Sequence, residues 1–306
     1  PLYGPLNFES KKAPLSSLEK KQWHLLDLTI DSIPGMSVER AYKELIKEKK
    51  GASVIVAIID SGVDINHPKI KDNIWVNKGE IPNNGLDDDQ NGFVDDVNGW
   101  NFLGNCEQEN MESVRLQKKE DPGSDIYENF EKQRQKNIQE KKEELSTINE
   151  FIEKALSSDS LIKKTLGVEK YTLNDVENFS PKSFKLIDAL IFQRDFKERG
   201  LSVSKLQDYK KGALISINKH YSLKFNPRVI VGDNPDDIND TNYGDGNVIG
   251  PVLDGADHGT HVSGIIASER EDSSGSKGIY NNVKIMVLRA VPDGDEYDKD
   301  VALAIR

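Results

Sequence analysis

Two short apolar runs stand out from an otherwise polar chain. The first runs from Val54 to Ile59 and ends in Asp60. An unbroken series of small and β-branched residues is typical of a parallel strand buried on both faces. We therefore expect a buried strand over residues 53–59, with the Asp60 carboxylate at its carboxyl end. The run from Val283 to Val291 has the same character and predicts a second parallel strand.

Helical periodicity dominates the remaining sequence. The spacing of apolar residues between Ser37 and Lys49 predicts a helix with Ser37 as its cap. The segment from Asp125 to Leu156 lacks Gly and Pro. Ile138, Leu145 and Ile152 lie seven residues apart, with Ile148 and Ala155 between them, which predicts a long amphipathic helix or half of a coiled hairpin. Shorter helices are expected from Ser180-Pro181 to Phe196, from Ser204 to Tyr221 and from Asp300 onward.

A third run begins with a histidine, which is a candidate catalytic residue. His258 precedes the small-residue stretch from Gly259 to Ala267, which predicts a tightly packed helix with an imidazole at its start. Imidazole suits a general base because its pKa lies near neutrality, and a carboxylate on its other nitrogen fixes the tautomer. We therefore assign His258 as base and Asp60 as its orienting carboxylate. The alternatives are a turn or cap role for Asp60 and a structural role for His258.

These two motifs resemble those of the subtilisin family of serine endopeptidases, the subtilases. The Asp motif is Asp60-Ser61-Gly62 after a strand, and the His motif is His258-Gly259-Thr260-His261-Val262-Ser263-Gly264. In that family the order is Asp, His and then Ser, and the two motifs here follow it. The resemblance extends over about residues 52–103 and 227–306.

The resemblance implies a mostly parallel, doubly wound α/β sheet and hydrolysis of polypeptide substrates by an Asp-His-Ser triad. It implies structural roles beside the site for Gly62, Gly259 and Thr260, and makes His261 a buried, hydrogen-bonded packing residue. It also implies a secreted, periplasmic or cell-surface location, and we expect Pro1 to be a trimmed amino terminus.

The family's Ser motif, Gly-Thr-Ser, does not occur in the sequence. The helix expected at the carboxyl end would be cut off after about two turns, leaving apolar surface uncovered. We therefore expect the chain to be the amino-terminal portion of a longer enzyme, inactive alone, with its serine and oxyanion-hole Asn beyond Arg306. The alternatives are a natural short protein and a non-catalytic pseudoprotease that presents its insertion to a partner.

Asp60 and His258 are 198 residues apart, which is far more than in compact subtilases. We expect an amino-terminal arm and a helix leading into the strand over residues 1–51, a catalytic domain over 52–104 and 226–306, and a helical insertion over 105–225. The charged runs of the insertion indicate solvated helix faces, or alternatively a partner-binding surface or substrate-shielding lid.

An acidic segment follows the Asp strand and has the first part of a calcium-loop pattern. Oxygen-bearing residues stand at positions 1, 3, 5 and 9, with Gly at position 6: Asp87, Asp89, Asn91, Asp95 and Gly92. Asn98 replaces the usual Glu at position 12, so the segment is not an EF-hand. We expect a structural calcium ion here, or alternatively a solvated acidic loop. A second acidic stretch, Asp233 to Asp245, predicts a flexible connection or another cation site.

Bulk properties exclude several classes of function. The net charge of −11 disfavours nucleic acid and anionic membrane as main partners. Cys106 is the single cysteine, so an intrachain disulfide and a thiolate metal cluster are excluded, and we expect it to be a bystander. No apolar run reaches about 18 residues, so no transmembrane segment is expected. A zinc-dependent hydrolase is disfavoured because His258 and His261 lack the i, i+4 spacing with an intervening Glu.

Overall fold

The structure, a computed structural model, describes residues 8–47, 49, 51–172, 174–175, 183–270 and 275–306. The chain divides into two compact units. One, here called the sheet unit, comprises Pro1–Glu109 with Pro227–Arg306, and the other, the helical unit, comprises Asn110–Asn226. The helical unit overlaps the insertion expected at residues 105–225.

The sheet unit is built on three parallel strands: β1 (Val54–Asp60), β2 (Gly99–Asn101) and β3 (Val283–Arg289). Their order is β1-β3-β2, so β3 lies in the centre. The register pairs Val54 with Val283 and Asp60 with Arg289, which brings the carboxyl ends of β1 and β3 to the same edge. Short helices connect the strands: η3 (Lys71–Asn73), α9 (Arg228–Val231) and η5 (Leu253–Ala256).

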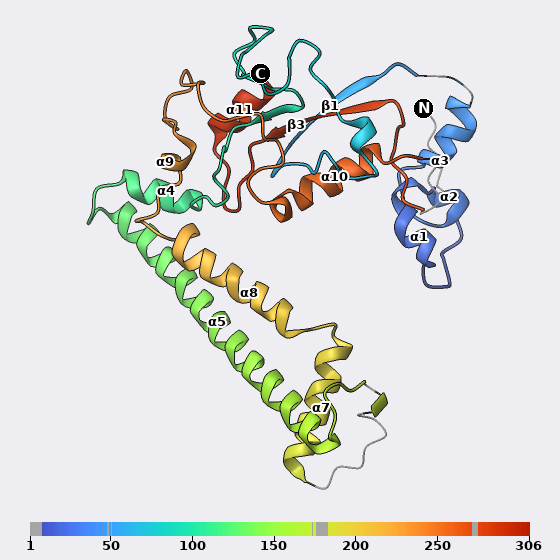
Figure 1. Cartoon of the computed structure of the whole chain (residues 1–306), viewed down its shortest axis with the longest axis vertical. Coiled ribbons are helices and arrows are strands. Elements are labelled where there is room, and N and C mark those ends of the chain that lie inside the picture. The colour runs from blue at the N-terminus through green and yellow to red at the C-terminus, as the bar shows by residue number, and fades with distance from the viewer. Residues whose placement is uncertain (1–7, 48, 50, 173, 176–182, 271–274) are drawn as a thin grey trace. The chain divides into compact units, whose positions relative to one another are not determined.

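Alternate side chains of β3 enter two cores on opposite faces of the sheet, as the two-residue period of a strand requires. Ile285 and Val287 pack with residues of α10 (Asp257–Ala267), whereas Leu288 packs with Trp100 and with α11 (Asp298–Ile305). Figure 1 shows α10 alongside β1 and β3. The predicted parallel α/β architecture is confirmed.

One part of the strand prediction was wrong. Val54 and Ile55 at the start of β1 are 49% and 53% exposed, whereas Ile58 near its end is buried. Within the described residues β1 pairs only with β3 and therefore lies at an edge of the sheet. An unbroken apolar run predicts the strand, but it does not establish how many neighbours cover it.

The amino-terminal arm consists of very short helices: α1 (Ser17–Gln22), η1 (Trp23–Leu25), α2 (Leu28–Asp31), α3 (Val38–Ala41) and the π-helical η2 (Tyr42–Ile46). Ser37 takes the predicted position before the first turn of α3, but it has φ 59° and its side chain makes no capping hydrogen bond. The arm is anchored by an ion pair of 2.7 Å between Glu39 and Arg270 and by a hydrogen bond that Tyr42 donates to the Ile279 carbonyl.

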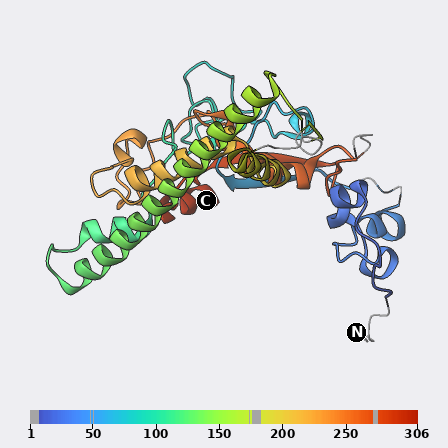
Figure 2. The same cartoon turned by 90° about the horizontal axis from the view of Figure 1, so that it is seen from below.

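The helical unit contains α4 (Glu112–Lys119), α5 (Asp125–Leu166), α7 (Phe184–Glu198), α8 (Val203–Ile215) and the π-helical η4 (Ser216–His220). Both α7 and α8 pack along α5, as Figure 1 and Figure 2 show. Ser124, Ser183 and Ser202 cap α5, α7 and α8 through their hydroxyl oxygens. The predicted helix start at Ser180-Pro181 lies outside the described residues.

The long helix has a buried heptad core that includes two residues of the predicted pattern, Ile148 and Ala155. These two residues and Ile162, spaced by seven, are buried against α7 and α8, whereas Ile138, Leu145 and Ile152 of the same pattern are half-buried.

Acidic residues after α9 form a buried ion-pair network in the sheet unit. Arg228 pairs with both Asp233 and Asp300, and Lys299 donates to Asp233 at 2.8 Å. Arg228, Lys299 and Asp300 are each at most 5% exposed. Side-chain cations of the protein therefore neutralise Asp233. The sequence predicted a flexible connection or a cation site for this stretch, and neither alternative included these ion pairs.

Candidate active site

Asp60 is the last residue of β1 and carries a buried carboxylate, with 8% exposure. Its backbone carbonyl accepts a hydrogen bond of 3.0 Å from Ala290 N, which extends the parallel ladder past the strand end. Its side chain accepts a bond of 2.7 Å from the backbone N–H of Ser61. The sheet and the following turn thus hold the carboxylate in one orientation.

His258 is the second residue of α10 and faces Asp60. Its Nδ1 atom lies 2.9 Å from each carboxylate oxygen of Asp60, although 198 positions separate the two residues. Because a carboxylate only accepts, Nδ1–H is the donor and Nε2 is left to take up a proton. This hydrogen bond raises the pKa of His258 above its ordinary value, with the negative charge of Asp60 as the second cause.

Two glycines allow α10 to approach the end of β1. Gly62 has φ 118°, a conformation that favours glycine, and an added Cβ would meet the carbonyl oxygens of Val248 and Ile249. At Gly259 an added Cβ would lie 3.1 Å from the Gly62 carbonyl carbon and closer still to its oxygen. Gly259 therefore packs directly against the turn that follows Asp60.

Thr260 ties the start of α10 to the loop after β1. Its hydroxyl donates to the Ala256 carbonyl at 2.6 Å and accepts from the backbone N–H of Asp64 at 2.8 Å. His261 is exposed, so the buried packing role that the resemblance implied is wrong for the structure described here. It lines a cavity of about 520 Å³ together with His24, His67 and Thr260.

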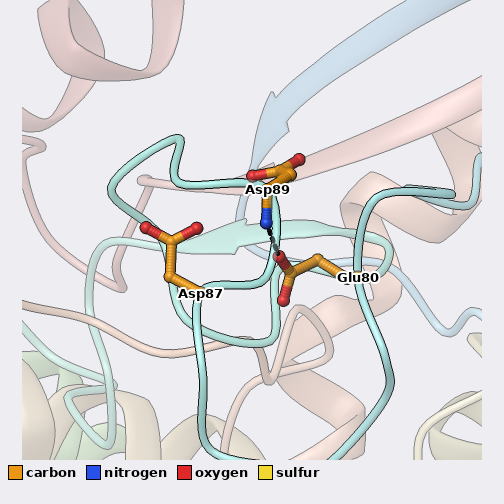
Figure 3. Close-up of side chains that lie close together, drawn as sticks. All are labelled: Glu80, Asp87 and Asp89. Carbon is orange, nitrogen blue, oxygen red and sulfur yellow. Dashed lines mark hydrogen bonds between the residues drawn. The ribbon is translucent and has the colours of Figure 1, made fainter.

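The acidic loop brings three carboxylates together: Glu80, Asp87 and Asp89 each place one oxygen within 4.8 Å of the others (Figure 3). The backbone N–H of Asp89 also donates to Glu80 Oε1 at 3.3 Å. Hard carboxylate oxygens in this arrangement suit a divalent cation such as calcium. Sequence reasoning missed Glu80, which precedes the loop pattern and has no spacing that identifies it.

The other two predicted ligands make hydrogen bonds within the loop. Both oxygens of Asp95 accept from backbone N–H groups, those of Asn84 and Gly85. Asn91 accepts from Phe93 N with its carbonyl oxygen and donates to Asp96 with its amide. Burial raises the pKa of Asp96, although the amides of Asn77 and Asn91 both donate to its carboxylate.

Comparison with known proteins identifies the family. The model of the subtilase family matches residues 51–306, which includes both Asp60 and His258. The chain belongs to the subtilase family. The subtilases are a family of serine peptidases.

Individual relatives match a shorter segment. "Subtilisin-like protease 1" of Plasmodium falciparum (isolate 3D7) is 50% identical over 64 residues, which are 21% of this chain and 9% of that protein. The proteins of the same name from Plasmodium vivax and Plasmodium berghei (strain Anka) are 45% and 42% identical over 64 residues, which are 21% of this chain and 10% and 11% of theirs. This subtilase chain thus matches about a tenth of the length of these relatives.

Proposed function

We propose that the protein is a serine endopeptidase in which His258 is the general base and Asp60 orients it. The observation that carries this proposal is the distance of 2.9 Å between His258 Nδ1 and the Asp60 carboxylate. The bond leaves Nε2 to take the proton of a serine hydroxyl and return it to the leaving amine. The side chain of His258 is 71% exposed, so a hydroxyl and a polypeptide substrate can approach Nε2.

The nucleophile is not assigned to a residue of this chain, because the sequence contains no Gly-Thr-Ser. We infer that the 306 residues alone do not hydrolyse peptides. The proposal is tested with the full-length protein and a fluorogenic peptide library. Hydrolysis should fall by a factor of about 10⁴ or more in His258→Ala, because loss of the base disables the triad. Hydrolysis that survives this change would refute the assignment, and an inactive full-length protein would favour a binding scaffold.

We also propose a structural calcium ion between Glu80, Asp87 and Asp89. Glu80 is only 7% exposed, and its Oε1 accepts from the backbone N–H of Asp88 at 2.9 Å, so its position is fixed. Three carboxylates this close repel one another unless a cation lies among them. Isothermal titration with Ca²⁺ tests the site, with Glu80→Gln as the variant. Equal calcium affinity in both proteins would exclude Glu80 as a ligand.

None of the described helices is both long and apolar enough to cross a membrane. We propose, on the family likeness, that the protein acts outside the cytoplasm, and fractionation of the producing cells tests this. For the helical unit we propose a role in shielding or recruiting substrate. Deletion of residues 110–226 should then change KM for protein substrates more than for short peptides, and equal effects on both would exclude that role.

A further inference from the structure

Arg289 is a buried cation at the edge where the active site lies. It ends β3, pairs in register with Asp60 and is 4% exposed. Burial lowers the pKa of its guanidinium. Sequence reasoning gave this residue no role beyond membership of the strand.

The guanidinium of Arg289 donates to four oxygens from two segments of the chain, the turn after β1 and the stretch from Asn101 to Cys106. Nε donates to the Ser61 carbonyl at 3.0 Å, Nη1 to Asn101 Oδ1 at 2.9 Å and to the Gly104 carbonyl at 3.1 Å, and Nη2 to the Cys106 carbonyl at 2.7 Å. None of these acceptors is a carboxylate. A rigid fork of donors is suited to holding several acceptors in a fixed arrangement.

A second buried arginine in the same unit provides a contrast. Arg228 is 5% exposed and pairs with the carboxylates of Asp233 and Asp300. Opposite charges balance the cost of burying that guanidinium, whereas the hydrogen bonds of Arg289 go to neutral dipoles. The arrangement around Arg289 therefore fixes backbone positions more than it balances charge.

The Ser61 carbonyl, which accepts from Arg289, belongs to the backbone turn at Ser61 and Gly62, here called the Ser61–Gly62 corner. This corner contacts Asp60 on one side and the residue after His258 on the other. On one side, the Ser61 N–H donates to Asp60 Oδ1 at 2.7 Å. On the other side, the Gly62 carbonyl lies against Gly259, the residue after His258. A rotation of the peptide between residues 61 and 62 would move the carboxylate and the start of α10 relative to each other.

We propose that Arg289 is a positioning residue of the active site: by holding the Ser61 carbonyl, it keeps the Asp60 carboxylate within hydrogen-bond distance of His258. The proposal rests on the function proposed above for Asp60 and His258. It assigns Arg289 no contact with substrate, and the effect of the residue passes through the Ser61–Gly62 corner.

Two physical effects of removing Arg289 have opposite signs, which makes the proposal testable. Loss of a nearby positive charge by itself would raise the pKa of His258, because the imidazolium would be repelled less. Loss of positioning would lower that pKa, because the hydrogen bond from Nδ1 to Asp60 is what raises it. The sign of the change therefore distinguishes the two effects.

The experiment is an NMR titration of the His258 ring in the protein labelled with ¹³C-histidine, with the resonance assigned by His258→Gln. In Arg289→Met we expect the pKa of His258 to fall by about half a pH unit, a modest shift because the ring is largely exposed. Arg289→Lys keeps the charge but donates from a single nitrogen, so it cannot hold all four acceptors of the two segments. We expect a fall there as well, and this variant decides the outcome if Arg289→Met does not fold.

Arg228→Met is the matched control, since it removes a buried arginine whose carboxylate partners are Asp233 and Asp300 rather than a member of the proposed triad. It should lower the melting temperature and leave the pKa of His258 unchanged. A pKa that stays the same or rises in Arg289→Lys would overturn the proposal, as would an equal fall in Arg228→Met. The titration needs no peptidase activity, so its failure is distinguishable from failure of the proposed function.

Discussion

Replacement of Gly259 by Ala is a sharp test of how α10 meets the end of β1. The added Cβ would lie 3.1 Å from the Gly62 carbonyl carbon, 3.2 Å from Asp60 Cβ and closer still to the Gly62 oxygen. Ordinary C···O contacts are about 3.3 to 3.6 Å, so the helix start must move by about 1 Å. Such a shift would lengthen the 2.9 Å bond between His258 and Asp60 beyond the range of a hydrogen bond.

The matched control is Gly264→Ala, in the same helix. An added Cβ there would meet only Ser268 Oγ, at an ordinary 3.5 Å. Both substitutions gain the same helix propensity of about 1 kcal/mol, so the difference between them isolates the steric effect. Overpacking costs about 1 to 3 kcal/mol, which corresponds to a melting temperature about 2 to 12 °C lower for Gly259→Ala than for Gly264→Ala.

The activity assay is kcat/KM of the full-length protein on a peptide substrate. A displacement of about 1 Å in the catalytic groups costs about 100-fold, so Gly259→Ala should lose that factor while Gly264→Ala stays near wild type. The reasoning would be refuted by equal melting temperatures and equal kcat/KM in the two variants.

The site and its surroundings lead to four further predictions. Asp60 raises the pKa of His258, so Asp60→Asn should shift the acid limb of the kcat/KM–pH profile to lower pH; an unmoved limb would contradict the pairing. Any stability from this pair is fully present below the unfolded pKa of His258 and is lost as pH rises through the folded pKa, so melting curves of wild type and Asp60→Asn should converge at alkaline pH. Chelation should lower the melting temperature of wild type but not of Asp89→Asn, and equal responses would count against calcium at that residue. Asp300→Asn leaves Arg228 short of one buried carboxylate and should cost about 3 to 5 kcal/mol in chemical denaturation, whereas a loss below about 1 kcal/mol would show the network to be dispensable.

The sequence predicted the features that depend on local pattern. A strand ending in Asp60 and a helix opening at His258 follow from short motifs, and the structure brings the two side chains together. The long helix was predicted to end at Leu156 but continues to Leu166. The stop signal was present, since Gly167 in the left-handed conformation is the first glycine after the helix begins.

Features that depend on tertiary packing could not be predicted in this way. β2 has only three residues and no hydrophobic pattern of its own, so its pairing with β3 could not be predicted from the sequence. Glu80 joins Asp87 and Asp89 because the chain turns back on itself. The acceptors of Arg289 are carbonyl and amide oxygens up to 228 positions away, and no residue type in the sequence marks them.

The most direct test of the central claim is covalent labelling of the full-length protein with a fluorophosphonate, which reacts with a serine only when a base activates it. The account predicts strong labelling of the wild type, loss of labelling in His258→Ala and severe reduction in Asp60→Ala. Labelling that persists unchanged in both variants would show that these two residues do not activate the nucleophile.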